Sequence, residues 1–117
     1  MGWSRIRHFS RDEFGGEPDP KLVHMLDEAR EAAAIPFVIT SGVRTAGENA
    51  AIGGADESAH VTGHAVDLKC ETSRDRFLML RALFEAGFDR IGVYDRHIHC
   101  DTSATADVAV TWLGKSK

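Results

Sequence analysis

The spacing of apolar residues predicts an amphipathic helix near the start of the chain. Its apolar positions recur at helical intervals: Leu22, Leu26, Ala29 and Ala33. Asp19 and Pro20, just before them, are typical of a helix N-terminus, because Asp caps free amides and Pro fits the first helical position. Pro36 prevents any continuation, so we expect this helix over residues 20–33.

A second amphipathic helix is predicted over residues 73–86. The apolar positions that we expect to face the core are Phe77, Leu80, Leu83 and Phe84. Gly87 follows and is typical of the position just after a helix. Between the two helices, residues 41–63 are rich in Gly, Ala and Ser, which favours a loop that contains one short helix over residues 47–52.

Short runs of β-branched and other apolar residues predict the strands. They cover residues 37–40, 65–70, 90–94, 97–101 and, as an edge strand, 108–113. Asp95 and Arg96 separate the third run from the fourth and predict a tight turn between them. The order of helices and strands predicts an α+β fold with a small, mainly antiparallel sheet.

The size and composition of the chain fit one soluble domain. It has 117 residues, 43% of them apolar and 27% charged, so we expect a single domain over residues 1–117 and a monomer. The formal net charge is −4, whereas a nucleic-acid-binding surface would be basic, so we expect no nucleic-acid partner. No apolar run approaches the roughly 20 residues of a membrane helix, so we expect no membrane partner.

The N-terminal residues and the two cysteines indicate the expected compartment of the protein. The N-terminal residues contain no apolar segment typical of a secretory signal, so we expect a protein that is cytoplasmic as synthesised. Cys70 and Cys100 are too few for a disulfide framework, and the sequence leaves open whether they pair.

Histidines and acids gather on one predicted face of the sheet. Alternate residues of a strand share a face, so His97, His99 and Asp101 point one way, and Asp67 lies on the same face of the neighbouring run. The apolar residues between them mark the core face: Val66, Leu68, Ile98 and Cys100. The other face therefore collects the polar side chains.

Two histidines and one carboxylate on that face predict a metal site. Catalytic zinc sites use three protein ligands and keep a position for water, whose pKa falls to roughly 7. We predict His60, Asp67 and His99 as the ligands of Zn²⁺. A non-haem iron oxygenase uses the same residue types, but the chain is short for the eight-stranded jelly roll of those enzymes. An ordinary surface role for these histidines is the other alternative.

Several segments carry a more specific signal. They are residues 9–14, residues 41–45 (Ser-Gly-Val-Arg-Thr) with Asn49 and Gly53-Gly54, the motif Ser-x-His-x-x-Gly-x-Ala-x-Asp over residues 58–67, and His-Ile-His-Cys-Asp over residues 97–101. In this order they resemble the zinc peptidases of the M15 family, which are D-alanyl-D-alanine carboxypeptidases and phage L-alanyl-D-glutamate endopeptidases (endolysins). The resemblance spans nearly the whole chain. It implies the hedgehog/DD-peptidase fold, with helices packed on one face of the sheet.

The resemblance also implies a role for each site residue. The zinc ligands would be the three residues predicted above. Arg44 would bind a carboxylate of the substrate, which suits a planar guanidinium, and Ser58 would hydrogen-bond the substrate or a ligand. Asp101 would orient the imidazole of a ligand from behind.

The general base departs from the pattern of many relatives. They place Asp or Glu three residues before the last histidine ligand, where this chain has Arg96, which cannot accept a proton at neutral pH. His97 is then the expected acid and base, as in the carboxypeptidase branch with His-x-His. Asp95, in the predicted turn, is a second candidate.

We therefore expect a zinc-dependent metallopeptidase that hydrolyses peptidoglycan stem peptides. The alternative is a non-catalytic zinc-binding module of hedgehog type or a structural protein of a phage, because the acid usual in relatives is missing at Arg96. An enzyme that acts on the cell wall and has no signal peptide needs another route out of the cell. A phage or prophage product that acts on the wall after release would meet that need.

Overall fold

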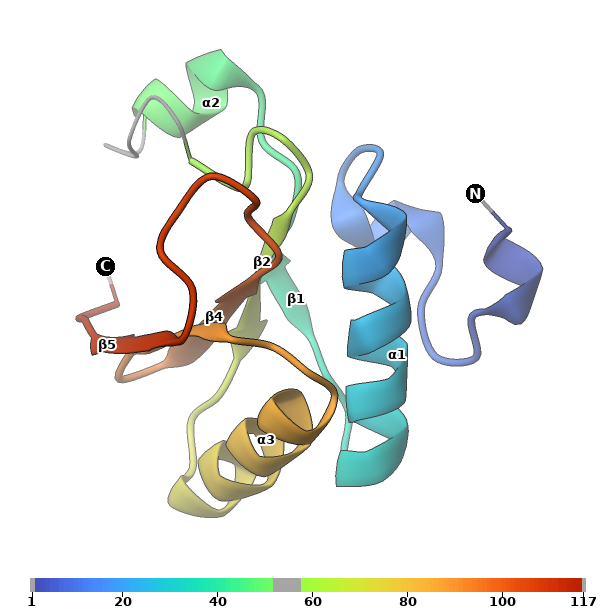
Figure 1. Cartoon of the computed structure of the whole chain (residues 1–117), viewed down its shortest axis with the longest axis vertical. Coiled ribbons are helices and arrows are strands. Elements are labelled where there is room, and N and C mark those ends of the chain that lie inside the picture. The colour runs from blue at the N-terminus through green and yellow to red at the C-terminus, as the bar shows by residue number, and fades with distance from the viewer. Residues whose placement is uncertain (1, 52–57, 117) are drawn as a thin grey trace.

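The computed structural model describes residues 2–51 and 58–116, which form one layer of helices against a sheet (Figure 1). The helices of the described residues are α1 (Pro20–Ala33), α2 (Ala46–Ala51) and α3 (Ser73–Glu85), with 3₁₀ turns η1 (Trp3–Arg5) and η2 (Arg11–Phe14) before them. The strands are β1 (Ile39–Ser41), β2 (Ala65–Lys69), β3 (Arg90–Val93), β4 (His97–Asp101) and β5 (Val110–Leu113). The predicted α+β class is confirmed.

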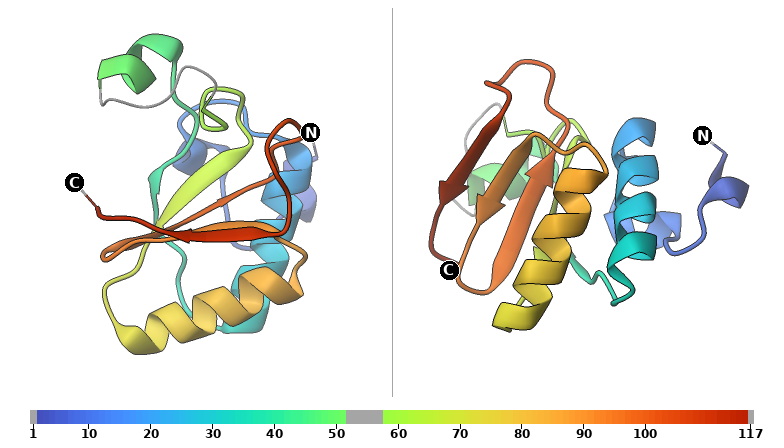
Figure 2. Two further views of the ribbon diagram at one scale, coloured as in Figure 1. Left: turned by 60° about the vertical axis from the view of Figure 1, so that its left-hand side comes forward. Right: turned by 60° about the horizontal axis from the view of Figure 1, so that its bottom comes forward.

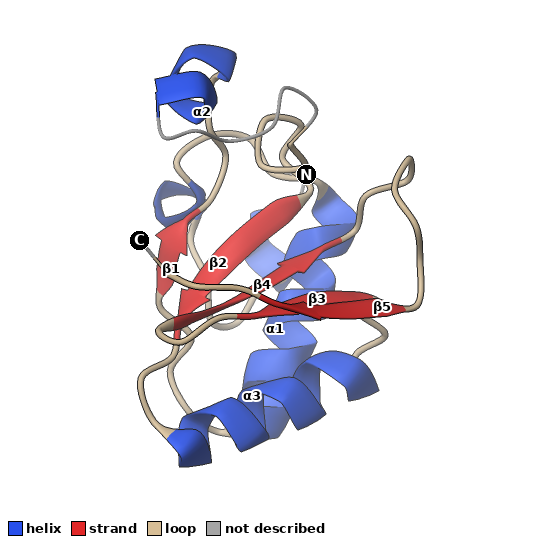
Figure 3. Ribbon diagram, turned by 90° about the vertical axis from the view of Figure 1, so that its left-hand side faces the viewer, coloured by secondary structure: helices blue, strands red, loops and turns tan. Residues whose placement is uncertain are grey.

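The helices α1 and α3 lie on the same side of the sheet (Figure 2). This leaves the opposite face free of helices, as Figure 3 shows, with only α2 standing beyond one end of the strands. The predicted helix over residues 47–52 corresponds to α2, although Ile52 and the Gly53-Gly54 pair lie outside the described residues. None of the described helices is long and apolar enough to cross a membrane.

The sheet has the strand order β1-β2-β4-β3-β5 and is mixed. The β1–β2, β2–β4 and β3–β4 pairs are antiparallel, whereas β5 pairs with β3 in parallel, so the expectation of a mainly antiparallel sheet needs this correction. The reason is that β4 already has a neighbour on each side. The edge nearest to β4 lies beyond β3, and a strand that reverses direction after β4 and pairs there runs parallel to β3.

Local capping defines both long helices. In α1 the Asp19 carboxylate accepts a hydrogen bond from the Leu22 amide at 3.3 Å, and Pro20 occupies the first position, as the sequence predicts. Ala34 takes a left-handed conformation, with φ 57°, and ends the helix. In α3 the Thr72 hydroxyl accepts from the Asp75 amide at 3.1 Å.

The predicted inward face of α3 is partly wrong. Phe77 and Phe84 are 64% and 51% exposed, whereas Met79, Ala82 and Leu83 are buried. At 100° per residue, the buried positions lie almost opposite the two phenylalanines. The two aromatic rings share a face at a spacing of seven residues, so the sequence offered two apolar stripes. Packing against α1 selected the one with smaller side chains.

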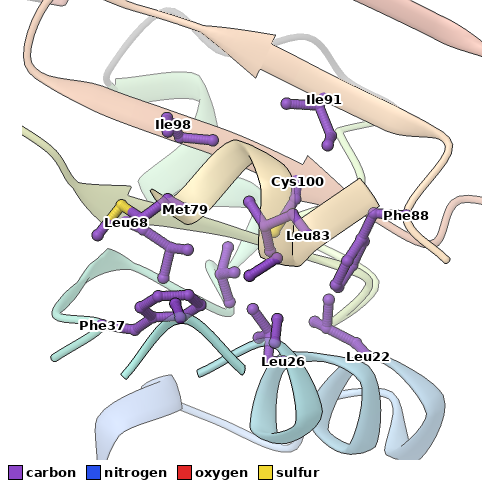
Figure 4. Packing of buried hydrophobic residues seen from close by; sticks show 14 of the residues in the cluster. Leu22, Leu26, Phe37, Leu68, Met79, Leu83, Phe88, Ile91, Ile98 and Cys100 are labelled. Carbon is purple, nitrogen blue, oxygen red and sulfur yellow. The ribbon is translucent and has the colours of Figure 1, made fainter. Parts of the chain in front are cut away.

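The core fills the space between the helices and the sheet (Figure 4). The strands contribute the alternating residues predicted to face it, all fully buried: Val66, Leu68, Ile98 and Cys100. Leu22 and Leu26 of α1 and Leu83 of α3 meet them there. Burying each of these leucine side chains stabilises the fold by about 1.5–3 kcal/mol, which holds the two layers together.

The two cysteines lie too far apart to pair. Cys100 is opposite Val66 in the β2–β4 ladder, and the Cys70 amide donates to the Arg96 carbonyl at the other end of it. Four residues of strand separate the two thiols along the ladder, about 13 Å at roughly 3.3 Å per residue. A disulfide needs Cα atoms within about 7 Å, so both thiols are free and buried.

A buried carboxylate ties the N-terminal segment to α1. Asp27 accepts hydrogen bonds from the Arg7 amide at 3.1 Å and the His8 amide at 2.9 Å, and Arg7 Nε lies 3.3 Å from it. Arg30 Nη1 donates to the His8 carbonyl at 2.8 Å from the next turn of the helix. Burial raises the pKa of Asp27, but the hydrogen bonds from Arg7 and His8 outweigh it and hold the pKa below its ordinary value of 3.8.

Replacing Asp27 by Asn should destabilise the protein mainly at pH values at which the Asp27 carboxyl is ionised. A lowered folded pKa means that the charged group stabilises the fold fully above 3.8, and that this contribution is lost as the pH falls through the lower folded value. We expect Asp27→Asn to lower the free energy of unfolding by about 1–3 kcal/mol near pH 7, and by less near pH 3. Urea denaturation at both pH values measures the difference.

The matched control for this variant is Asp12→Asn, which changes an exposed carboxylate in η2. It should leave the free energy of unfolding within about 0.5 kcal/mol of the wild type. An Asp27→Asn variant destabilised equally at both pH values would show that the charge of Asp27 does not stabilise the fold.

Candidate metal centre

On the helix-free face of the sheet, one row of paired residues crosses four strands and contains two of the predicted ligands. Asp67 of β2 is opposite His99 of β4, His99 is opposite Gly92 of β3, and Gly92 is opposite Trp112 of β5. Residues paired across neighbouring strands point to the same face. The row therefore holds a carboxylate, an imidazole, a position without a side chain and an indole.

A second row lies beside the first, toward the β3–β4 turn. His97 is opposite Lys69 in the β2–β4 ladder, and the Tyr94 amide donates to the His97 carbonyl at 3.0 Å. Asp101, on the other side of the first row, is opposite Ala65. The polar face predicted from strand alternation for Asp67, His97, His99 and Asp101 is therefore the face that the structure shows.

His60 reaches the row from the loop before β2. Its Nδ1 lies 2.9 Å from the Gly42 carbonyl oxygen, and its Nε2 lies 3.4 Å from Asp67 Oδ1. A proton on Nδ1 donated to this carbonyl leaves the Nε2 lone pair directed at the cluster. The side chain is only 4% exposed, so its orientation is fixed by the protein.

Close backbone contacts at two glycines position His60. A Cβ on Gly42 would lie 2.4 Å from the Phe14 carbonyl oxygen, so only glycine lets η2 approach the backbone after β1, where the Gly42 carbonyl contacts His60. Gly63 has φ +81°, and a Cβ there would lie 2.8 Å from the Glu17 carbonyl oxygen. These two contacts explain the glycines of the Ser-Gly-x-Arg and Ser-x-His-x-x-Gly segments.

His99 lies between two carboxylates. Its Nδ1 is 3.0 Å from Asp67 Oδ1, and its Nε2 is 2.7 Å from Asp101 Oδ2. Burial raises the pKa of Asp67, but hydrogen bonds from His60 and His99 outweigh it and hold the pKa well below its usual range. Asp67 is therefore an anion at neutral pH, as a metal ligand must be.

His60, Asp67 and His99 can hold a metal ion. One ligand atom from each lies within 4.8 Å of the others. The two rings are in edge contact, with centroids 5.2 Å apart, so their nitrogens converge on the carboxylate. Two imidazole nitrogens and one carboxylate oxygen suit a divalent transition metal with room for a further ligand. The structure thus brings together the three residues that the sequence predicts as ligands.

Asp101 lies behind His99 and is itself held by Arg90. Arg90 Nε donates to Asp101 Oδ1 at 2.7 Å, and the Ser103 amide donates to the same oxygen at 3.1 Å. Asp101 is 2% exposed, so the ion pair is shielded from water. This is the position predicted for Asp101. Arg90 is not among the residues predicted for the site, although its alternation with Ile91 in β3 places it on the polar face.

His97 lies at the border of the cluster with one nitrogen held. Its ring stacks on Tyr94 with centroids 4.2 Å apart, and its Nδ1 lies 2.7 Å from Ser116 Oγ. Its Nε2 has no hydrogen-bond partner among residues 2–51 and 58–116. When Nδ1 donates to the hydroxyl, Nε2 keeps its lone pair. The role of Ser116 could not be read from the sequence, because this residue is 19 positions away from His97.

Asp95, the second candidate base, is not brought to the cluster. Its Oδ1 accepts from the Ser116 amide at 2.5 Å, and its Oδ2 lies 3.9 Å from Arg96 Nε. Its side chain is 57% exposed in the β3–β4 turn. Within the described part of the chain, it makes no hydrogen bond or ion pair with His60, Asp67 or His99.

Arg44 and Ser58 lie on the other side of the cluster, next to His60. The Arg44 amide donates to the His60 carbonyl at 3.1 Å, and Arg44 Nη2 lies 3.5 Å from Ser58 Oγ. Ser58 Oγ also accepts from the His60 amide at 3.2 Å. Among the described residues, the buried Arg44 Nε has no hydrogen-bond partner, and no carboxylate forms an ion pair with this side chain. A guanidinium that no described carboxylate neutralises is suited to an anionic partner.

Comparison with known proteins adds one finding. The family model described as Peptidase M15 matches residues 7–101, well over half of the chain. The match includes His60, Asp67 and His99 and ends at Asp101. No curated protein matches the chain.

Replacing Asp101 by Asn should weaken metal binding without removing a ligand. Asp101 uses one carboxylate oxygen to accept from Arg90 and the other to contact His99 Nε2. Asn has a single acceptor oxygen and cannot make both contacts, so the His99 ring loses its fixed orientation. Losses of this kind reduce metal affinity by about 10–100-fold. Competition with a chromophoric chelator for Zn²⁺ measures the dissociation constant.

The control is Glu85→Gln, which changes an exposed carboxylate at the end of α3 and should leave the metal affinity unchanged. His60→Ala, which removes a ligand, should bind the ion far more weakly than Asp101→Asn. Equal affinities of Asp101→Asn and the wild type would show that Asp101 does not support the metal centre.

Proposed function

The chain belongs to the peptidase M15 family, and from this premise we propose that it is a zinc-dependent peptidase that hydrolyses peptidoglycan stem peptides. The observation that carries the proposal is the convergence of His60, Asp67 and His99 on one point of the helix-free face. The family supplies the reaction class. The donor set supports zinc, because nitrogen and carboxylate oxygen are ligands that Zn²⁺ commonly takes.

The residues around the cluster fit this ion. A zinc ion held there would act as a Lewis acid and would make water nucleophilic near neutral pH. His60 Nε2, one oxygen of Asp67 and His99 Nδ1 would hold it. The Gly42 carbonyl and the Asp101 carboxylate fix the two imidazole rings from behind through the opposite nitrogens. The protein thus orients its ligands before any ion binds.

His97 is the group that we propose moves the proton. Its free Nε2 would take a proton from the attacking water as the C–O bond forms and give it to the leaving amine as the C–N bond breaks. Ser116 and Tyr94 hold the ring for this task from Nδ1 and from its face. Asp95 is less suited, because its carboxylate is exposed and engaged with Ser116.

Arg44 is the group that we propose binds the substrate carboxylate. Its buried Nε and its Nη2 next to Ser58 lie on the His60 side of the cluster. A carboxylate can accept two parallel hydrogen bonds from a guanidinium, which fixes the direction of the peptide as well as its position. A stem peptide that ends in D-alanine offers this carboxylate on the leaving residue.

Mass spectrometry of purified stem peptides, after incubation with the zinc-loaded protein, tests the function. Loss of a terminal alanine would identify a D-alanyl-D-alanine carboxypeptidase. Cleavage between L-alanine and D-glutamate would identify an endopeptidase. Unchanged peptides, with zinc shown to be bound, would contradict the proposal and favour the non-catalytic zinc-binding module.

Replacing His97 by Ala should abolish most hydrolysis but keep the metal. Loss of a general acid and base lowers kcat by about 10²–10⁴-fold, whereas the three ligands are untouched. Peptide hydrolysis and chelator competition measure the two effects on the same sample. His24→Ala, which removes an exposed histidine of α1, is the matched control and should retain full activity. If Asp95→Asn loses more activity than His97→Ala, the base has been assigned to the wrong residue.

Replacing Arg44 by Met should raise KM for peptides with a free terminal carboxylate. A hydrogen bond to a charged group contributes about 1.5–3 kcal/mol, which corresponds to a loss of about 10–100-fold in kcat/KM. The same peptide with an amidated C-terminus distinguishes loss of carboxylate binding from a structural effect of the substitution. Wild type and Arg44→Met should cleave the amidated peptide with similar efficiency. An equal loss on both peptides would show that Arg44 supports the fold of the loop rather than binding the carboxylate.

A further inference from the structure

Trp112 occupies the far end of the row that contains the metal ligands. Its ring centroid lies 5.4 Å from that of His99, and the Arg90 guanidinium carbon lies 5.2 Å from the indole centroid. The family match ends at residue 101, so β5 and its tryptophan belong to a segment that the match does not cover. This part of the chain contributes its own wall to the site.

Gly92 provides the space for the indole. A Cβ at this position would lie 2.6 Å from Trp112 Cε2 and Nε1, so the ring rests on bare backbone of β3. Trp112 Nε1 donates to Tyr94 Oη at 3.1 Å, and Tyr94 in turn stacks on His97. The indole is thus held on one side by Arg90 and at its nitrogen by Tyr94, although the residue remains half-buried.

The strand order places this tryptophan opposite the carboxylate-binding residue. Arg44 follows β1, at one edge of the sheet, and Trp112 lies on β5, at the other edge (Figure 3). The row from Asp67 to His99 lies between them. A peptide whose carboxylate pairs with Arg44 and whose scissile bond lies at the cluster must therefore extend its acyl side toward β5.

We propose that Trp112 and Tyr94 form an aromatic wall that binds an apolar side chain on the acyl side of the scissile bond. This inference rests on the proposed function and adds a specificity determinant to it. Half-buried aromatic rings next to a polar cluster are the usual contact for aliphatic groups in such sites, since they gain apolar burial without moving. Arg90, Tyr94 and Gly92 hold the indole in place before the substrate binds.

Hydroxamates test the aromatic wall without requiring hydrolysis. A hydroxamate binds a zinc ion in place of the scissile carbonyl, and its acyl side carries the side chain of interest. The probes are N-acetyl-glycine hydroxamate and both enantiomers of N-acetyl-leucine hydroxamate. Calorimetry on the zinc-loaded protein gives their dissociation constants. We expect one leucine enantiomer to bind about tenfold more tightly than the glycine probe, as burial of part of an isobutyl group predicts.

Variants assign that preference to the indole. Trp112→Ala should reduce the ratio of the leucine-probe to the glycine-probe affinity to less than about twofold, and Trp112→Phe should retain part of the preference. Gly92→Ala should also reduce the preference, because the added methyl group displaces the ring. Phe77→Ala removes an exposed aromatic residue of α3 and should keep the full preference.

Fluorescence gives a second readout of the same contact. The chain has two tryptophans, and Trp3 packs on Phe14, so Trp3→Phe leaves Trp112 as the only indole. The emission of this variant should change when the leucine probe binds and much less when the glycine probe binds. Identical changes with both probes would contradict the wall.

The outcomes separate the wall from the enzyme. If the aromatic wall exists but the protein is not a stem-peptide hydrolase, the leucine preference is seen while stem peptides stay intact. If the protein is a stem-peptide hydrolase but has no aromatic wall, stem peptides are cleaved. Trp112→Ala then binds the three probes with the wild-type affinity ratios, or its affinity for all three falls equally. The first result would overturn the proposed function alone, and the second would overturn the aromatic wall alone. Failure of the zinc-loaded protein to bind any of the three probes would overturn the aromatic wall, whereas cleavage of stem peptides alone decides the proposed function.

Discussion

The register between β2 and β4 is the constraint on which the rest of the site depends. It pairs Asp67 with His99 on the helix-free face, and it pairs Val66 with Cys100 on the core face. A slip by one residue would turn Asp67 and His99 into the core and expose the apolar side chains between them. The apolar burial that holds the two helices against the sheet is therefore the same force that brings the candidate metal ligands together.

A continuous chain of polar contacts then fixes each ligand. It runs from Arg90 through Asp101 to His99, across Asp67 to His60, and ends at the Gly42 carbonyl. Each buried polar atom in it has a partner, which offsets the cost of removing it from water. The rings of His60 and His99 are therefore preorganised in the arrangement that the proposed metal site requires.

The segment after β4 completes the centre from the outside. It returns along the free edge of β3, where Trp112 covers Gly92 and Ser116 reaches His97. The strand itself is short and at the edge, so its contribution to the core is small. Its main contacts are with residues of the polar face, which ties the C-terminal part of the chain to the chemistry rather than to the fold.

The sequence by itself determined the composition of the site, and only the tertiary structure decided its surroundings. Alternation within each strand and the Ser-x-His-x-x-Gly-x-Ala-x-Asp segment are local properties, so the polar face and the candidate residues His60, Asp67 and His99 could be predicted. The parallel pairing of β5, the exposure of Phe77 and the place of Trp112 could not. Each of these depends on which elements become neighbours across the fold, and contacts between distant segments leave no periodic trace in the sequence.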